Sequence, residues 1–321
     1  MILDILAYGA FFLATALTYA IVCLGLNVQW GQTGLFNVGV AGFVAIGAYT
    51  SALLTSPATP GRFGGFGLPI AMGWIMAMVV AASAAWLIGR ITLRLRADYL
   101  AITTFGVATV IQLVALNAEF LTGGPFGIGF IPRPFAGLAE QVALYDLVHL
   151  LLVAAVLTMV YLAIERLAAS PWGRVLRAIR ENEEAAVSLG KDANSYRLQA
   201  FVLGSAIMGL AGAMQAHFIG FIAPENYLPA LTFQVWAMLI IGGSGNNRGA
   251  ILGAILVWAL WSISGAAIGS FVPADLQARA ATLRIVAVGV ALVAILLWRP
   301  NGLLNEKETV SRHVAANSGG P

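Results

Sequence analysis

Long apolar runs dominate this chain of 321 residues and restrict the folds open to it. A membrane-spanning helix needs about 20 mostly apolar residues to cross about 30 Å of hydrocarbon. The seventh candidate window is too short to cross by itself, and the second is interrupted by Gly34, Gly39, Gly42 and Gly47. We therefore predict an all-α, polytopic membrane protein with about nine spans, some of them broken. The nine windows lie near residues 5–26, 33–55, 67–89, 98–119, 143–164, 197–222, 229–242, 249–270 and 281–299.

The shortage of charge excludes several other classes of protein. Hydrophobic residues make up 60% of the chain and charged residues 10%, whereas a soluble domain carries about 25% charged residues. With 17 basic and 14 acidic residues, the chain cannot cover a water-facing surface. An ordinary soluble enzyme and a disordered protein are therefore excluded. The formal net charge of only +3 also argues against a nucleic-acid partner.

The basic residues predict the orientation, because short cytoplasmic loops carry the excess of Lys and Arg. With nine spans, alternate loops fall on opposite sides. One set of loops holds 13 basic residues: Arg90, Arg94, Arg96, Arg166, Arg174, Arg177, Arg180, Lys191, Arg197, Arg248, Arg299, Lys307 and Arg312. The other set holds four: Arg62, Arg133, Arg279 and Arg284. We place the first set in the cytoplasm, which puts the N-terminus outside and the C-terminus inside.

The chain lacks the residues of an ATP-hydrolysing enzyme. A P-loop, G-x-x-x-x-G-K-[ST], built on Lys191 would need glycine and Ser or Thr where Ala185 and Asp192 stand. His149, His217 and His313 show no metal-ligand spacing, so no metal site is expected. We expect His149 and His217 near helix ends or in the packed bundle. The single cysteine, Cys23, cannot form an intramolecular disulfide.

The acidic residues lie near the ends of the apolar windows rather than at their centres. Ion-coupled carriers usually place ionisable groups in mid-membrane. This weakens a proton-driven mechanism, although Na⁺ sites built from backbone carbonyls would leave no such trace. The chain is therefore interpreted as the pathway of a transporter that receives its energy from elsewhere.

A polar loop at about 166–197 predicts short helices at the membrane surface. Ser170 followed by Pro171 is a favourable helix start, and Gly190 is a favourable stop. Asn182 is an alternative cap for a second, shorter helix. The spacing predicts a small apolar patch that a partner protein could approach closely, formed by Ala185, Ala186 and Leu189. The alternative is a basic amphipathic loop that rests on anionic headgroups.

The same loop resembles a known motif. Glu184-Ala185-Ala186, three residues and Gly190 resemble the EAA loop of ABC importer permeases, which docks into the ATPase subunit. The preceding run, residues 173–183, which contains Arg177, is similar to branched-chain amino-acid permeases of the LivM type. This resemblance assigns ATPase coupling to Arg177, Glu184, Ala185, Ala186 and Gly190.

Three further stretches carry the resemblance, and together the similar segments extend from about residue 20 to 302. They are Gly25 through Leu53, Leu93–Ile102 with Leu121–Pro125, and Gly209–Ala213 with Gly220–Pro224. One departure is Val40, which stands where family members often have a histidine after the glycine of the second span. A role attached to that histidine cannot be carried over.

The resemblance implies the permease subunit of a bacterial ATP-driven importer in the inner membrane, which moves branched-chain or other hydrophobic amino acids inward. It implies no cofactor, because ATP would be bound by two cytoplasmic ATPase subunits. The other implied partners are a second, LivH-type permease subunit, a periplasmic amino-acid-binding protein and membrane lipid. Urea or short amides are an alternative substrate class, and an ion-driven secondary carrier, a membrane enzyme or a scaffold are alternatives of other classes.

Interrupted helices are the expected sites of substrate passage, because their free backbone ends can hold a zwitterion. Three glycine-containing breaks qualify. The candidate pathway residues are Asn37, Gly39, Gly42, Thr122, Gly123, Gly124, Gly242 and Gly243. The alternative is close helix packing, which small residues also permit. We expect a permease domain over residues 1–305 and a short disordered cytoplasmic tail over 306–321.

Overall fold

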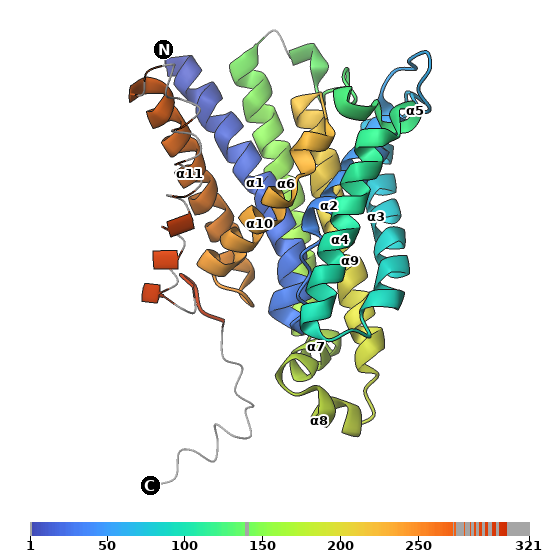
Figure 1. The fold of residues 1–321 in the computed structure, drawn as a ribbon. Helices are drawn as coiled ribbons and strands as arrows, with labels where there is room; N and C mark the ends of the chain where they lie inside the picture. Colours follow the sequence, from blue (N-terminus) through green and yellow to red (C-terminus); the bar gives the residue numbers. More distant parts are fainter. Residues whose placement is uncertain are drawn as a thin grey trace.

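A computed structural model describes residues 2–138, 141–271 and part of the chain between 273 and 306. The described residues form α-helices, three short 3₁₀ turns and two isolated β-bridges (Figure 1). The helices are α1 (Ile2–Thr33), α2 (Val40–Thr55), α3 (Ile70–Thr92), α4 (Ala97–Asn117), α5 (Glu119–Thr122), α6 (Val142–Ala169), α7 (Pro171–Glu181), α8 (Glu183–Ser188), α9 (Ala193–Ile219), α10 (Pro229–Gly242) and α11 (Asn247–Phe271). The 3₁₀ turns are η1 (Gly124–Phe126), η2 (Ala136–Leu138) and η3 (Pro224–Tyr227).

Six of the described helices are long and apolar enough to cross a membrane: α1, α3, α4, α6, α9 and α11. The helices α2 and α10 are also apolar but have 16 and 14 residues, which at 1.5 Å per residue gives about 24 and 21 Å. Each of the first eight predicted windows thus holds an apolar helix, which confirms a polytopic, all-helical protein. The ninth window, 281–299, is described only in part, and residues 307–321 of the predicted tail lie outside the described residues.

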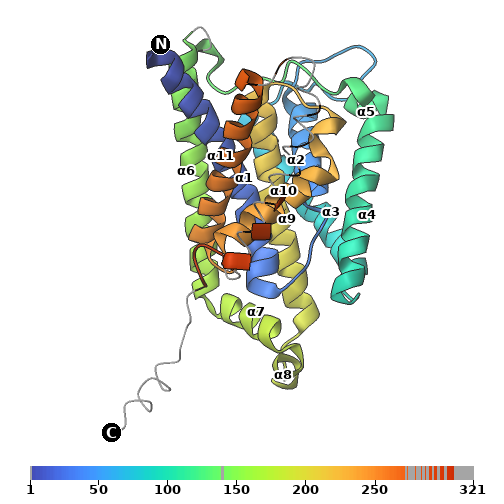
Figure 2. The same ribbon diagram turned by 60° about the vertical axis from the view of Figure 1, so that its left-hand side comes forward.

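Two helices form the centre of the bundle. In α9, 78% of the most apolar stretch is buried, and in α1 61% is buried. The corresponding fractions for α3, α4, α6 and α11 lie between 17% and 22%. These four helices therefore surround the centre and turn apolar side chains outward, as a lipid-facing layer would (Figures 1 and 2).

Glycines let α9 approach its neighbours at backbone distance. A Cβ placed on Gly25 of α1 would lie 2.6 Å from the carbonyl oxygen of Gly204 in α9. Further along α9, Gly212 meets the backbone of Val44 in α2 in the same way. Such close crossings are typical of membrane helices, where small residues allow extensive van der Waals contact.

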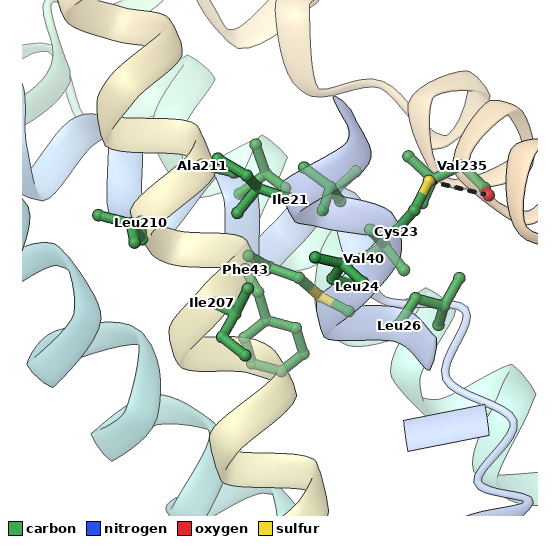
Figure 3. Packing of buried hydrophobic residues seen from close by; sticks show 14 of the residues in the cluster. Ile21, Cys23, Leu24, Leu26, Val40, Phe43, Ile207, Leu210, Ala211 and Val235 are labelled. Atoms are coloured by element: carbon green, nitrogen blue, oxygen red, sulfur yellow. Dashed lines mark hydrogen bonds between the residues drawn. The ribbon is translucent and has the colours of Figure 1, made fainter. Parts of the chain in front are cut away.

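Apolar side chains fill the space that remains among α1, α2 and α9 (Figure 3). Ile21 and Leu24 of α1 are fully buried there. Phe43 of α2 meets Phe201 of α9 edge to face, with ring centroids 5.5 Å apart. Cys23 is buried as well, and its Sγ lies 3.9 Å from the carbonyl oxygen of Val235 in α10. This cysteine is a packing residue.

The basic loops gather at one end of the bundle, where α7 and α8 project (Figure 1). At that end, Arg248 donates from Nε to the Tyr161 hydroxyl over 3.1 Å. At the opposite end, where α1 begins, Arg133 donates to the carbonyl oxygen of Ile219 over 2.8 Å. The described loops therefore alternate between ends as the distribution of basic residues predicts.

Candidate functional site

The loop that projects from the bundle begins with α7. Pro171 is the first residue of α7, as predicted, and Ser170 has the extended backbone of an N-cap. The predicted N-cap position is confirmed, although the Ser170 hydroxyl does not cap α7 but donates to the carbonyl oxygen of Leu167 at 2.6 Å. Ser170 thus both ends α6 and precedes the first residue of α7. Gly173, Leu176 and Ile179 form the buried stripe of α7.

A second short helix, α8, follows at a sharp bend. The Asn182 side chain accepts a hydrogen bond from the backbone N–H of Ala185 at 3.0 Å, so Asn182 is the N-cap of a separate helix. At the other end, Gly190 has a φ of 77°, which residues with a Cβ rarely adopt. Its N–H bonds to Val187 at 2.8 Å, and the N–H of Lys191 bonds to Ala186 at 3.1 Å. The predicted glycine stop is confirmed.

The bend at Asn182 changes which face of α8 is exposed. Ala186 is buried and packs with Ile179 and Ala193. The predicted apolar patch of Ala185, Ala186 and Leu189 is therefore wrong, because Ala186 faces inward. Glu184 and Ala185 are exposed, and 80% of the Leu189 side chain is accessible. The outward surface of α8 is thus acidic at its start and apolar at its end.

Arg180 joins the projecting loop to the bundle. From α7, its guanidinium donates a hydrogen bond to the carbonyl oxygen of Gly31, in the last turns of α1. Its Nη2 also forms an ion pair with Glu306, 2.9 Å from Oε2. Arg177, one turn earlier in α7, lines a cavity of about 230 Å³ beside this contact. Other residues lining the cavity are Gln32, Glu165, Asn246 and Asn247.

The first broken helix lies between α1 and α2. Gly34 ends α1 with a φ of 73°, and the chain stays non-helical to Gly39. Asn37 holds this segment: its Nδ2 donates to Gln29 Oε1 at 2.8 Å, and its Oδ1 accepts from the Gly39 N–H at 2.7 Å. The Trp236 indole donates to the Asn37 carbonyl oxygen at 2.9 Å. Asn37 is fully buried, and its Nδ2, its Oδ1 and its carbonyl oxygen each have a protein partner.

The neighbouring glycines of this break bring α2 against α4. A Cβ on Gly39 would lie 2.7 Å from the carbonyl oxygen of Thr104, and one on Gly42 would lie 3.0 Å from the Cα of Ala108. Helix packing therefore explains both glycines. The Thr104 hydroxyl also accepts from the N–H of Val38 at 3.0 Å, which satisfies a backbone group that the break exposes.

The second break lies at the opposite end of the bundle. Thr122 donates from its hydroxyl to the carbonyl oxygens of Ala115 and Ala118, at 2.6 and 2.8 Å. Gly123 and Gly124 follow with φ values of 77° and 57°. This turn therefore stands far from the projecting loop along the bundle (Figure 1).

The third break follows α10, on the side of the projecting loop. Gly242 ends α10, and its carbonyl oxygen accepts from the N–H of Leu304 at 3.0 Å. Gly243 closes the helix through a bond from its N–H to Leu239 at 3.0 Å. The N–H of Gly245 then reaches Asn27 of α1 at 2.9 Å. The first and third breaks thus both adjoin the last turns of α1.

Comparison with known proteins identifies the family. Residues 9–297 match the family described as branched-chain amino acid transport system, permease component. The chain belongs to this family. It is 36% identical to the high-affinity branched-chain amino acid permease LivM of Escherichia coli K12, over 89% of this chain and 67% of that protein. It is 28% identical to the probable LivM of Methanocaldococcus jannaschii, over 91% of this chain and 92% of that protein.

A more distant relative is the permease LivH of Salmonella typhimurium, 23% identical over 91% of this chain and 92% of that protein. No solved structure matches the chain significantly. The permease is thus a multi-pass membrane protein homologous to a bacterial inner-membrane LivM, and the permease component of a branched-chain amino acid ABC transport system. As in its family, this component is non-catalytic and has no cofactor, since ATP binds to ATPase subunits.

The two histidines in the described part of the chain, His149 and His217, have structural partners. His217 is buried, and its ring lies 2.7 Å from the Pro132 carbonyl oxygen and 2.8 Å from the Ser51 hydroxyl. His149 is also buried and stacks on Phe218, 4.0 Å between centroids. Both therefore belong to the packed bundle, as predicted. Within the described residues, no three His, Cys, Asp or Glu side chains are placed to hold a metal ion.

Sequence reasoning missed the polar groups that join the permease's helices. Asn27 donates to Asn247 at 2.8 Å, and Asn247 donates to Glu165 at 3.2 Å, which connects α1, α11 and α6. Gln29 donates to the Phe201 carbonyl oxygen at 2.8 Å. These polar side chains lie just outside the predicted apolar windows, so hydropathy gave no signal of the hydrogen bonds that they form between helices. Arg180 is one of six basic residues in its loop and carries no distinguishing signal.

Proposed function

We propose that the permease moves branched-chain or other hydrophobic amino acids into the cell and takes its driving force through the loop at residues 170–190. The supporting observation is Arg180, which ties α7 both to the last turns of α1 and to Glu306. A displacement of α7 by a bound ATPase would therefore move the end of α1. The ends of both adjoining helix breaks would move with it.

We assign ATPase coupling to Arg177, Glu184, Ala185, Ala186 and Gly190. Glu184 and Ala185 are exposed for contact, Ala186 anchors α8 on α7, and Gly190 fixes its end. In this assignment the projecting end is cytoplasmic, the N-terminus is outside and a ninth span lies at 281–299. The positive-inside rule supports the orientation, because the basic loops gather at the projecting end.

The proposed partners are a LivH-type permease, two ATPase subunits and a periplasmic amino-acid-binding protein. The similarity to both LivM and LivH supports a pair of related permeases. The pathway is assigned to the breaks after α1 and α10 and to the outer turn at Thr122–Gly124. Residues 1–305 form the permease domain in this proposal, followed by a cytoplasmic tail at 306–321.

The test is transport in proteoliposomes that contain the permease and these partners, with labelled Leu, Val, Ala and urea. We expect ATP-dependent uptake of Leu and Val that persists with a protonophore. Uptake without ATPase subunits, abolished by the protonophore, would identify an ion-driven carrier instead. Uptake of urea in preference to the amino acids would reject the substrate assignment.

The coupling assignment has a separate test. The double substitution Glu184→Gln with Gly190→Val should abolish ATP-driven uptake while the protein still inserts in the membrane. Asp98→Asn is the control, because Asp98 is an exposed acid at the same end of the bundle that lies in the first turn of α4 and not in the projecting loop. Full uptake by the double variant would rule out this loop as the coupling element.

A further inference from the structure

A second cavity, of about 550 Å³, opens beside the projecting loop. It lies where three segments meet: the break after α1, the turn between α3 and α4, and the start of α8 with the start of α9. The lining residues used below are Arg94, Arg96, Arg197, Glu183, Phe36 and Leu100. It shares no lining residue with the cavity beside Arg177.

The cavity is strongly positive. Three guanidinium groups line it, from Arg94, Arg96 and Arg197, against one carboxylate, from Glu183. The Glu183 carboxylate already accepts from Arg197 Nη1 at 2.8 Å. Within the described part of the chain, Arg94 and Arg96 form neither an ion pair nor a hydrogen bond. The side chains that line the cavity therefore leave two positive charges without a compensating carboxylate.

One donor in the cavity wall is left without an acceptor. The Nε of Arg197 is buried and has no hydrogen-bond partner, although Nη1 of the same group is paired. A buried donor without a partner is unfavourable, so a wall of this kind favours an oxygen acceptor that can reach it. The cavity thus offers positive charge to an anion, and a shift of the Arg197 side chain would bring its unpaired Nε to the ligand as well.

The surroundings of the cavity are apolar on the membrane side. The turn between α3 and α4 carries Arg94 and Arg96, and the adjoining helix ends expose Ile91, Tyr99 and Ile102. Phe36 and Leu100 form part of the cavity wall itself. A ligand that fits this place has an anionic head for the arginines and a hydrocarbon part that can lie along α3 and α4.

We propose that this cavity binds the phosphate headgroup of an anionic phospholipid from the cytoplasmic leaflet. Basic pockets between membrane helices at the cytoplasmic side are suited to such headgroups, whose charge they neutralise. A transported zwitterionic amino acid has no net charge to match two unpaired arginines. The site rests on the cytoplasmic placement of the projecting end in the proposed function, but not on the substrate or the coupling assignment, so its test can fail while transport and coupling stand.

The experiment compares lipid retention by the whole permease, measured by native mass spectrometry from detergent. The probes are phosphatidylglycerol, phosphatidylcholine and inorganic phosphate. At about 1 kcal/mol per basic residue, Arg94→Gln with Arg96→Gln should weaken phosphatidylglycerol binding by about tenfold or more. Arg166→Gln is the matched control, because Arg166 is an exposed arginine at the same end that lines neither cavity.

A third variant gives an effect of opposite sign. Glu183→Gln removes the one carboxylate of the cavity and frees Arg197, so phosphatidylglycerol binding should strengthen several-fold. Phosphatidylcholine binding should be the same in all variants. A monodisperse elution profile and unchanged helix content identify variants that have folded.

Four outcomes would overturn the assignment. If the wild type and the Arg94/Arg96 double variant bind phosphatidylglycerol equally, the cavity is not the lipid site. If Arg166→Gln weakens phosphatidylglycerol binding as much as the double variant does, the binding reflects general surface charge and not this cavity. Displacement of phosphatidylglycerol by millimolar inorganic phosphate makes it a site for free phosphate. If the Arg94/Arg96 double variant retains lipid as the wild type does but no longer binds the ATPase subunits in the reconstituted transporter, the cavity is a protein-docking surface.

Discussion

Arg180 and Glu306, 126 residues apart in the sequence, form an ion pair with 2.9 Å between Nη2 and Oε2. The same guanidinium donates to the Gly31 carbonyl oxygen. One side chain therefore holds together the projecting loop, the end of α1 and the segment that follows Gly302. Three parts of the chain that local sequence cannot connect meet at this group.

Arg180→Ala should reduce ATP-driven uptake more than Glu306→Ala, because only the first change also removes the bond to Gly31. Both side chains are partly exposed, so solvent screening limits the ion pair itself to about 0–1 kcal/mol. A double-mutant cycle on uptake and on reversible unfolding in mixed micelles measures the coupling. Additive effects of the two substitutions would show that the pair does not act as a unit.

Gly190→Val should destabilise the end of α8 by about 1–2 kcal/mol, because the φ of 77° forces a side chain into a left-handed backbone conformation. Gly106→Ala is the control, since a Cβ at Gly106 meets nothing within 4 Å. Limited proteolysis of the loop and ATP-driven uptake are the measurements. We expect the protease to cleave the loop faster in Gly190→Val than in Gly106→Ala, and equal cleavage rates would contradict the prediction.

Asn37→Ala should destabilise the permease by about 1–3 kcal/mol, because it leaves the buried Gln29 Oε1 and the Gly39 N–H without their partners. Asn117→Ala is the matched control: the exposed Asn117 only bonds the Leu113 carbonyl oxygen of its own helix. Thermal unfolding in detergent compares the two. Equal melting temperatures would refute a structural role for Asn37.

Gly212→Val should prevent correct packing of α9 on α2, because any Cβ at Gly212 would overlap the Val44 backbone. Forcing extra volume into a packed core costs about 1–3 kcal/mol, and more where the backbone must move. Gly9→Val is the control, as a Cβ there meets nothing within 4 Å. Yield of monodisperse protein reports the difference, and similar yields would contradict the close crossing.

The position of a helix could be predicted from the sequence where a proline or a glycine marks its ends. The window 229–242 coincides with α10, because Pro229 begins it and Gly243 ends it. In contrast, α1 continues to Thr33, past the predicted end at residue 26, because Asn27 and Gln29 find hydrogen-bond partners on other helices. A hydropathy window ends at such polar residues, because it does not include the hydrogen bonds that they form with other helices.

The candidate site was predictable in its local geometry but not in its contacts. Gly190 and the two-helix alternative at Asn182 follow from capping chemistry, which depends on neighbouring residues alone. The inward face of Ala186 depends on the angle between α7 and α8, and that angle is set by contacts with α9. The Arg180–Glu306 pair depends on the whole fold, so no local pattern could indicate it.

The segment around Gly302 has a consequence for the order of assembly. Leu303 and Leu304 donate their N–H groups to the end of α10, and Glu306 completes the contact with Arg180. The ribosome makes these residues after every described helix. The projecting loop therefore acquires its full attachment to the bundle only after all of these helices have been made, and a chain truncated before Gly302 would lack the contact between Arg180 and Glu306.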